Sequence, residues 1–325
     1  MESRSKDFIL DIGILSYNHF NFIPECLDSI LNQKTTYNFR IFIIDDHSYD
    51  NTYNILLEEY KKRFPELIFI HRNESNLGPI KSAKYLATKL KSKYITFLDG
   101  DDYWCYNNKL QEQIDFLENN PDYAGCFHDA LIKQENSGDD EYLKKTQNQW
   151  KTYSQFNKYS SDFMPWALIQ RNIIPTASLV FRNINLTTFL DSYRAKEFSL
   201  SWALHLEIIK NSKFKYFNQT WSVYRDHPEG YSKKHRLTDF KFNNISILEN
   251  LLKDPAWNYY KADIYRSICN EYRMILKSTC KTIDSFKEYK KLLKQYSKYL
   301  KLAQKEDLKQ LKDDYYYVRH NRMVE

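Results

Sequence analysis

The chain has 325 residues, of which 42% are hydrophobic and 28% are charged, and its net charge is +6. A chain of this length can bury a full core and could form one large domain or one and a half. Its apolar runs stay well short of the ~20 residues that a membrane-spanning helix needs. Its five cysteines lack metal-ligand spacing and no secretory leader is evident, so we expect a cytoplasmic protein with reduced thiols.

Four short apolar segments near the start of the chain predict strands separated by helices. They span residues 10–15, 40–44, 67–70 and 94–98. The first is followed by Ser16, Tyr17 and Asn18, and the second by the acidic run DDHSYDNT at 45–52. Alternating strands and helices are typical of a parallel sheet, which binds its ligands at the carboxyl ends of the strands. We therefore expect these polar side chains to share one ligand site.

Three carboxylates follow the strand predicted at 94–98. Asp99, Asp101 and Asp102 lie within four residues, and Gly100 permits a sharp turn between them. Such a cluster repels itself unless a cation or a network of donors compensates it. Hard oxygen ligands suit Mg²⁺ or Mn²⁺, which commonly share their coordination with substrate phosphates. An acidic surface turn is the alternative, but it does not account for a second acidic run after another strand. The pattern predicts a nucleotide-sugar site.

Further along the chain, residues 109–119 have the pattern of an amphipathic helix that Pro121 stops. Residues 123–127 read as a strand ending in His128 and Asp129, and residues 179–181 as another strand. The polar stretch 133–161 between them is expected to be a mobile loop region. Beyond about residue 238 the pattern is helical, and no internal repeat is found.

Several of these segments resemble the family 2 glycosyltransferases, which have the GT-A fold. The matching segments, in order, are ILSYN at 14–18, DDHSYDNT at 45–52, NLG at 76–78, LDGDD at 98–102 and YRDH at 224–227. Each is weak alone, but together, with strand–helix spacing, they make a strong signal. The resemblance implies an α/β, GT-A-like domain with a mainly parallel central sheet, followed by a helical C-terminal extension. The implied boundaries are 1–102 for the nucleotide-binding half, 103–235 for the acceptor-side half and 236–325 for the extension.

The resemblance also implies a role for particular residues. Asp46 would accept a hydrogen bond from N3–H of uracil or thymine, which cytosine lacks, so the donor would be a UDP-sugar, with a dTDP-sugar as alternative. Ser16, Tyr17 and Asn18 would line the nucleotide loop, and Asp99 would lie near the ribose. The implied ligands of Mn²⁺ or Mg²⁺ are Asp101, Asp102 and His227.

The catalytic base is ambiguous in the sequence. In the resembling family it is an acid before an aromatic residue, on the helix that precedes the Tyr-Arg-x-His segment. Counting back from Tyr224 without gaps places Ser201 at that position. A shift of one helical turn places Glu197 there, followed by Phe198, and restores the acid-aromatic pattern. We predict Glu197 as the base, with an ordinary solvated helix residue as the alternative interpretation.

These features predict a metal-dependent, inverting glycosyltransferase that acts on a glycan or lipid-linked glycan. The resemblance implies a role in bacterial surface polysaccharide, lipooligosaccharide or glycoprotein assembly. Ser201 in the gapless register leaves a second hypothesis, a sugar-nucleotide-binding protein that has lost catalysis. A nucleotidyltransferase is less favoured, because the turn after the first strand lacks a Gly-rich, basic loop. We expect no nucleic-acid binding, because basic residues alternate with acidic ones and no base-stacking module is present.

The basic C-terminal tail has two interpretations. Residues 281–325 contain 12 Lys and Arg against 7 Asp and Glu, which accounts for most of the excess positive charge. The tail could form an amphipathic helix on an anionic membrane, peripheral to the inner face of the cytoplasmic membrane. Alternatively it could be a helical cap on the catalytic domain or a homodimer contact with solvated lysines. Tyrosines stand where deep apolar anchors are expected, which favours the cap.

Overall fold

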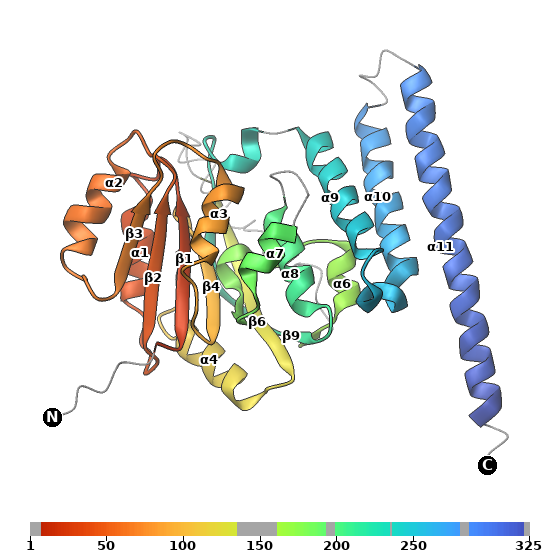
Figure 1. Cartoon of the computed structure of the whole chain (residues 1–325), viewed down its shortest axis with the longest axis horizontal. Helices are drawn as coiled ribbons and strands as arrows, with labels where there is room; N and C mark the ends of the chain where they lie inside the picture. Colours follow the sequence, from red (N-terminus) through yellow and green to blue (C-terminus); the bar gives the residue numbers. More distant parts are fainter. Residues whose placement is uncertain (1–7, 135–160, 193–198, 235, 280–285, 322–325) are drawn as a thin grey trace, which may run out of the picture. The chain divides into compact units, whose positions relative to one another are not determined.

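The computed structural model describes residues 8–134, 161–192, 199–234, 236–279 and 286–321. The chain divides into two compact units, coloured along the sequence in Figure 1. Unit 1 comprises Met1–Met164 and Ile173–Gly230, and unit 2 comprises Pro165–Asn172 and Tyr231–Glu325. Most of the loop region predicted at 133–161 lies outside the described residues.

Parallel strands form the first half of the sheet of unit 1. β1 lies between β2 and β4, and β2 pairs with β3, which gives the order β3-β2-β1-β4 (Figure 1). Their bounds are Leu10–Ser16 for β1, Phe39–Asp45 for β2, Ile68–Arg72 for β3 and Tyr94–Asp99 for β4. All four predicted strands are confirmed within two residues at each end. Burial is nearly continuous along β1 and along most of β2, and residues such as Ile12, Ile43 and Leu98 are fully buried, as expected for parallel strands covered on both faces.

Helices connect these strands. Their bounds are Ile23–Leu31 for α1, Thr52–Ile55 for α2, Leu56–Lys61 for the π-helical turn η1 that continues it, Pro79–Ala87 for α3 and Lys109–Asn119 for α4. The helix predicted at 109–119 is confirmed. It forms because Leu110, Ile114 and Leu117 recur on one face, where all three are fully buried in the core. The following Asn120 and Pro121 end it.

The second half of the sheet mixes parallel and antiparallel pairs. β8 runs antiparallel to both β4 and β6, β6 is parallel to β9, and β5 and β7 are antiparallel to β9. The bounds of these strands and of the helical segments near them are Tyr103–Trp104 (β5), Tyr123–Gln134 (β6), Asp162–Phe163 (β7), Thr176–Ser178 (η2), Val180–Arg182 (β8), Leu186–Ser192 (α7), Leu200–Ile209 (α8) and Lys213–Asp226 (β9).

One strand boundary was predicted wrongly. The strand predicted at 123–127 continues as β6 to Gln134, so His128 and Asp129 lie inside it and not at its end. The reason is that β6 pairs with β9 as far as the match of Gln134 with Asp226. This long-range pairing keeps even polar residues in an extended conformation, and a local apolar pattern does not reveal it.

Unit 2 is helical, as predicted for the C-terminal extension. Its segments are Pro165–Gln170 (α6), Tyr231–Lys234 (η3), Leu237–Leu251 (α9), Pro255–Tyr260 (η4), Lys261–Thr279 (α10) and Phe286–Asn321 (α11). α10 packs against both α9 and α11. Tyr299 of α11 stacks on Tyr272 of α10, with ring centroids 5.9 Å apart, and its hydroxyl donates to Glu249 of α9. Among the described helices, none is long and apolar enough to cross a membrane.

Candidate active site

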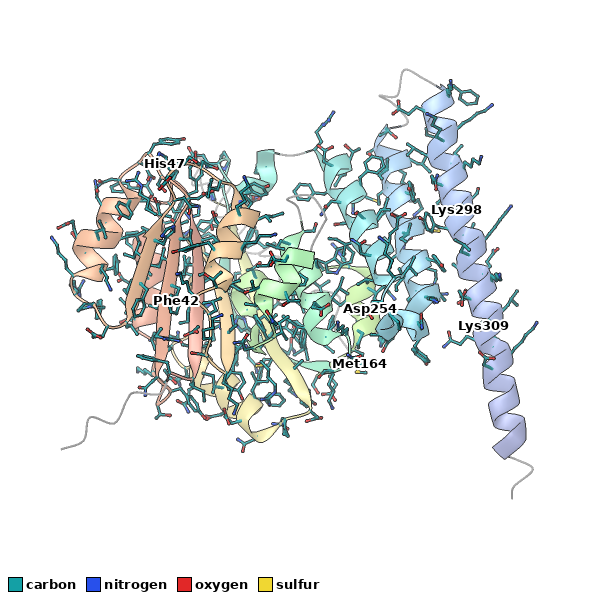
Figure 2. The ribbon with its side chains drawn as sticks, viewed as in Figure 1. Phe42, His47, Met164, Asp254, Lys298 and Lys309 are labelled. Carbon is teal, nitrogen blue, oxygen red and sulfur yellow. The ribbon has the colours of Figure 1, made fainter. Side chains whose placement is uncertain are left out.

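The carboxyl ends of β1, β2 and β4 meet at one edge of the sheet. In the parallel register Ser16 lies beside Asp45, and Leu15 lies beside Asp99. His47, the second residue after β2, marks this edge in Figure 2. The structure therefore brings together the polar loops that the sequence placed after separate strands, where parallel sheets bind ligands.

Asp46 ties the end of β2 to the loop before α3. Its buried carboxylate accepts hydrogen bonds from Nδ2 of Asn73 at 2.6 Å and from the backbone N–H groups of Leu77 and Gly78, both at 2.9 Å. Gly78 has φ 81°, a left-handed conformation that favours glycine. The DDHSYDNT and NLG segments thus contact each other directly. Three donors fix the carboxylate, which as a charged group can still accept a further bond.

The loop after β1 is held by the acidic run after β2. Asn18 is left-handed, with φ 58°; its N–H donates to Oγ of Ser48 at 2.9 Å, and its Oδ1 accepts from the N–H of Tyr49 at 3.1 Å. The rings of Tyr17 and Tyr49 meet edge to face, 5.9 Å apart. The Oγ of Ser16 is buried and has no hydrogen-bond partner among the described residues. A buried hydroxyl of this kind at a ligand-binding edge is suited to contact a bound molecule.

Asp101 lies between two histidines from distant parts of the chain. Its Oδ2 is 3.0 Å from Nε2 of His227 and 3.8 Å from Nε2 of His19. The Nδ1 of His19 is buried and lacks a partner in the described part of the chain. The structure thus brings Asp101 and His227 together, and their role as metal ligands stays a prediction. His19 was not assigned a role from the sequence, although it follows Asn18 in the loop already expected at the site.

Arg225 holds the loop that carries the acidic cluster. Its backbone N–H donates to Oδ1 of Asp102 at 3.0 Å, and its guanidinium donates to the backbone carbonyl of Asp101 and to the carboxylate of Glu25. The guanidinium also lies over the ring of Tyr103, 4.5 Å from its centroid, and is 3% exposed. One carboxylate oxygen of Asp102 therefore already accepts a hydrogen bond from β9. Arg225 belongs to the YRDH segment, but the sequence gave no signal of its ion pair with Glu25. This ion pair joins residues about 200 positions apart.

Burial and mutual repulsion set the protonation of the three carboxyls. Burial, and then the negative charge of Asp101, raise the pKa of Asp99 to about 7. Burial and the charges of Asp101 and Asp99 hold the pKa of Asp102 well above its usual range. Burial acts in the same direction on Asp101, but the hydrogen bond from His227 and the charges of His19 and His227 outweigh it and lower its pKa. A cation near this cluster would favour the ionised form of all three groups.

The donor set around Asp101 fits a divalent ion. It combines carboxylate oxygen with imidazole nitrogen, and Mn²⁺ accepts both. Within the described ranges, no group of three or more His, Cys, Asp or Glu side chains is arranged to hold a metal. If an ion binds here, Asp101 and His227 would supply only part of its coordination sphere. Substrate phosphate oxygens and water commonly complete such spheres.

The predicted base lies outside the described residues. Glu197 belongs to residues 193–198, for which no structure is described. Ser201, which takes the position of the base when the count back from Tyr224 has no gap, lies in the first turn of α8. Ser199, which precedes this helix, has φ 61°. The structure thus describes the helix that the sequence expected before the YRDH segment, and the choice of base stays a prediction.

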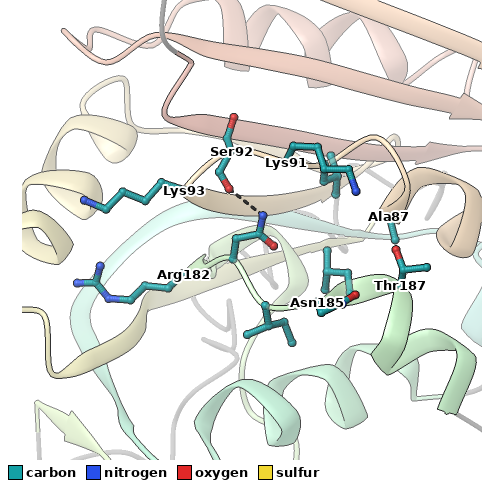
Figure 3. A pocket seen from close by; sticks show the side chains of 11 residues that line it. Ala87, Lys91, Ser92, Lys93, Arg182, Asn185 and Thr187 are labelled. Carbon is teal, nitrogen blue, oxygen red and sulfur yellow. Dashed lines mark hydrogen bonds between the residues drawn. The ribbon is translucent and has the colours of Figure 1, made fainter.

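A separate cavity of about 580 Å³ lies at the amino end of β4, away from this site (Figure 3). Lys93 and Arg182 line it, but Lys93 pairs with Glu118 at 2.7 Å, and Arg182 donates to the backbone carbonyls of Tyr123, Leu117 and Asn120. In the wall of the cavity, Nδ2 of Asn183 donates to the backbone carbonyl of Ser92 at 2.9 Å. These cationic groups already hold the wall together, so we do not assign the nucleotide to this cavity.

Comparison with known proteins places the chain in a family. The family model "Glycosyl transferase family 2" matches residues 11–184, more than half of the chain. An uncharacterized protein of Mycobacterium tuberculosis is 29% identical over 223 residues, which cover 68% of this chain and 60% of that protein. TuaG of Bacillus subtilis, whose name assigns it to teichuronic acid biosynthesis, is 26% identical over 222 residues, covering 65% of this chain and 85% of TuaG. The chain thus spans less than two thirds of the mycobacterial relative.

Solved structures with low sequence identity share the fold. Staphylococcus aureus TarS 1–349 in complex with UDP-GlcNAc superposes with a TM-score of 0.63 at 14% identity, covering 90% of this chain and 81% of that one. The mannosyltransferase PcManGT of Pyrobaculum calidifontis, in complex with GDP-Man and Mn²⁺, has a TM-score of 0.51 at 12% identity, covering 92% and 87%. These structures have the GT-A fold, as the sequence predicted. The chain belongs to glycosyl transferase family 2 and has the GT-A fold.

Proposed function

We propose that this glycosyltransferase moves a sugar from a UDP-sugar to a hydroxyl of a glycan or lipid-linked glycan, with inversion at the anomeric carbon. A dTDP-sugar is the alternative donor. The observation that carries the proposal is the meeting of Asp101 with His227 beside the loops of Ser16 and Asp46. The name of TuaG, and that of a poly(ribitol-phosphate) beta-glucosyltransferase of Bacillus spizizenii that is 36% identical over 95 residues, support a role in surface-glycan assembly.

The nucleotide is proposed to lie between the loops that follow β1 and β2. Uracil N3–H would donate to the remaining acceptor site of Asp46, whose orientation is fixed by Asn73 and the NLG loop. The ring of Tyr17 and the polar atoms of Ser16 and Asn18 would contact the base and ribose. Cytosine presents an acceptor where uracil presents N3–H, so a CDP-sugar would leave two acceptors facing each other.

The diphosphate is proposed to bind with Mn²⁺ or Mg²⁺ at the end of β4. Asp101 and His227 would hold the ion, with the Asp102 oxygen that does not accept from Arg225. Asp99 would lie near the ribose. A divalent ion bound there would offset the negative charge on the departing diphosphate. Arg225 would keep the aspartate loop in the geometry that this requires, since it binds both the Asp101 carbonyl and Glu25.

Inverting transfer needs one base on the acceptor side. The acceptor hydroxyl loses its proton as its oxygen attacks the anomeric carbon, and a carboxylate within hydrogen-bond reach can take that proton. We assign this role to Glu197. The alternative is a protein that binds sugar nucleotides without transferring the sugar, because Ser201 occupies the expected position in the gapless register, and its hydroxyl has little proton affinity near neutral pH.

A thermal-shift panel of nucleotides tests the donor assignment. We expect UDP and dTDP to raise the midpoint of unfolding with Mn²⁺, and CDP and GDP to do so much less. A ligand at 100 times its Kd adds about 2.7 kcal/mol of stability, which is readily detected. The control is Asp101→Asn, which should lose the Mn²⁺-dependent part of the shift. Equal shifts with and without Mn²⁺, or a CDP shift as large as that of UDP, would contradict the proposal.

We further propose that the enzyme works in the cytoplasm at the inner face of the membrane, where a lipid-linked acceptor would be presented. Homodimerisation through the C-terminal helices is the alternative role for unit 2. Both follow from the basic tail of the sequence.

A further inference from the structure

Helix α11 carries its positive charge on one face. At about 100° per residue, nine lysines between Phe286 and Asp313 fall within an arc of about 100°. All nine are exposed, and only Leu308 interrupts them in that arc. We call this set the lysine face; its members are Lys287, Lys290, Lys291, Lys294, Lys298, Lys301, Lys305, Lys309 and Lys312.

The lysine face is not neutralised by acidic side chains. None of its nine members forms an ion pair with a carboxylate in the described part of the chain. Lys290 and Lys298 lie over the rings of Phe286 and Tyr299, at 4.7 and 5.0 Å. The acidic residues of the same helical stretch lie outside the arc, and Asp307 among them pairs with Arg266 of α10. A row of like charges is unfavourable unless anions screen or bind it.

The other side of α11 is already occupied. Tyr299 and Ala303 are buried, and Tyr299 stacks on Tyr272 of α10. This packing fixes the rotation of α11 within unit 2 and points the lysine face outward, as Lys298 and Lys309 show in Figure 2. Tyr299, one of the tyrosines that argued against a membrane helix in the sequence, therefore serves the contact with α10, and the lysine face stays exposed.

Exposed apolar side chains run beside the lysine face, about 40–80° beyond one edge of its arc. Leu293, Leu300 and Leu311 are 41%, 38% and 65% exposed, and Phe286 lies on the same line. Leu308, within the face, is also exposed. Basic residues beside an apolar stripe are the pattern of helices that lie in the plane of a membrane interface. Long lysine stems can reach lipid phosphate groups around such a stripe.

We propose that the lysine face binds the surface of an anionic lipid bilayer. The row from Lys287 to Lys312 is about 37 Å long and straight, which matches a flat surface of lipid phosphates. A second copy of the chain is less suited, because a symmetric contact would oppose two lysine faces. A nucleic-acid duplex is less suited as well, because it would leave the apolar stripe exposed to water. The inference deepens the proposed location at the membrane and rests on that part of the proposed function, and it does not depend on the proposed glycosyl transfer.

Co-sedimentation of the full chain with lipid vesicles tests the proposal. We expect binding to vesicles with about 30% phosphatidylglycerol, little binding to pure phosphatidylcholine, and loss of binding between about 0.1 and 0.5 M NaCl, because salt screens exposed charges. The test variant replaces Lys287, Lys294, Lys298 and Lys305 with Gln, and should reduce the partition coefficient at least tenfold. The matched control makes the same change at four exposed lysines elsewhere, Lys62, Lys89, Lys91 and Lys253, and should change it less than twofold.

A second variant probes the apolar stripe. Leu300→Ser should weaken vesicle binding several-fold without changing its salt dependence, because it removes an apolar contact and no charge. Equal losses in the test and control quadruple variants would overturn the proposal, since net charge alone would then explain binding. So would equal binding to both vesicle types, a DNA duplex that binds as tightly as the anionic vesicles, or a test variant whose only change is in oligomeric state.

Discussion

Replacing Asp46 with alanine should cost both stability and nucleotide affinity. The carboxylate accepts three hydrogen bonds, and a bond to a charged group contributes about 1.5–3 kcal/mol. The N–H groups of Leu77 and Gly78 are only partly buried, so water can replace the carboxylate there, whereas the amide of Asn73 is buried. We therefore expect a loss of about 2–4 kcal/mol in the free energy of unfolding, less than the sum of three bonds. UDP affinity should fall by roughly 10- to 150-fold, since one further bond to the same carboxylate is lost.

Urea unfolding and calorimetric titration of UDP measure these two effects separately. The matched control is Asp11→Ala, which removes a buried carboxylate that accepts from the backbone N–H groups of Lys91 and Ser92 at the other edge of the sheet. It should destabilise the protein comparably and leave UDP affinity unchanged where the variant is folded. Wild-type stability in Asp46→Ala, or equal losses of UDP affinity in both variants, would refute this reasoning.

Three further changes test other parts of the account. Burial lowers the pKa of Lys109 to about 7, so between pH 7 and 10 the unfolded chain binds one more proton than the folded chain. The free energy of unfolding of the wild type, minus that of Lys109→Met, should therefore rise by up to about 1.4 kcal/mol per pH unit in this range. Urea titrations at several pH values measure this difference. A difference that does not change with pH would contradict the lowered pKa of Lys109. Arg225→Met should weaken Mn²⁺-dependent UDP binding more than tenfold, whereas Arg182→Met, also destabilising, should not; equal effects would leave Arg225 with no positioning role. Glu197→Gln should lower kcat by ~10²–10⁴ with little change in UDP-sugar affinity, and a large gain of activity in Ser201→Asp would instead favour the gapless register.

The local sequence pattern was sufficient to predict those helices and strands whose burial follows from neighbouring residues. The helix at Lys109–Asn119 and the strand at Tyr94–Asp99 match their predictions because apolar spacing, Pro121 and Gly100 are local signals. β6 was predicted too short because its second half, in which Ala130, Leu131 and Ile132 stand among polar residues, is held by pairing with β9. Pairing between distant strands has no local signature, so such boundaries are harder to predict.

In the candidate active site, too, some features could be predicted from the sequence and others could not. Topology alone predicted that the loops of Ser16, Asp46 and Asp99 would share an edge, because all parallel strands end there. That Asp101 would meet His227, 126 residues away, came from the family resemblance and not from spacing. The clamp of Arg225 on Glu25 was not predicted at all, since long-range ion pairs depend on how β9 crosses the edge of the sheet.

Release of UDP from a panel of UDP-sugars, with and without Mn²⁺ and with a glycan acceptor mixture, tests the central claim most directly. We expect the wild type to release UDP from at least one UDP-sugar only when the ion is present. Asp101→Asn, which keeps the shape of the side chain and removes its charge, should release none. UDP release that is the same without Mn²⁺, or undiminished in Asp101→Asn, would contradict the proposed metal-dependent transfer.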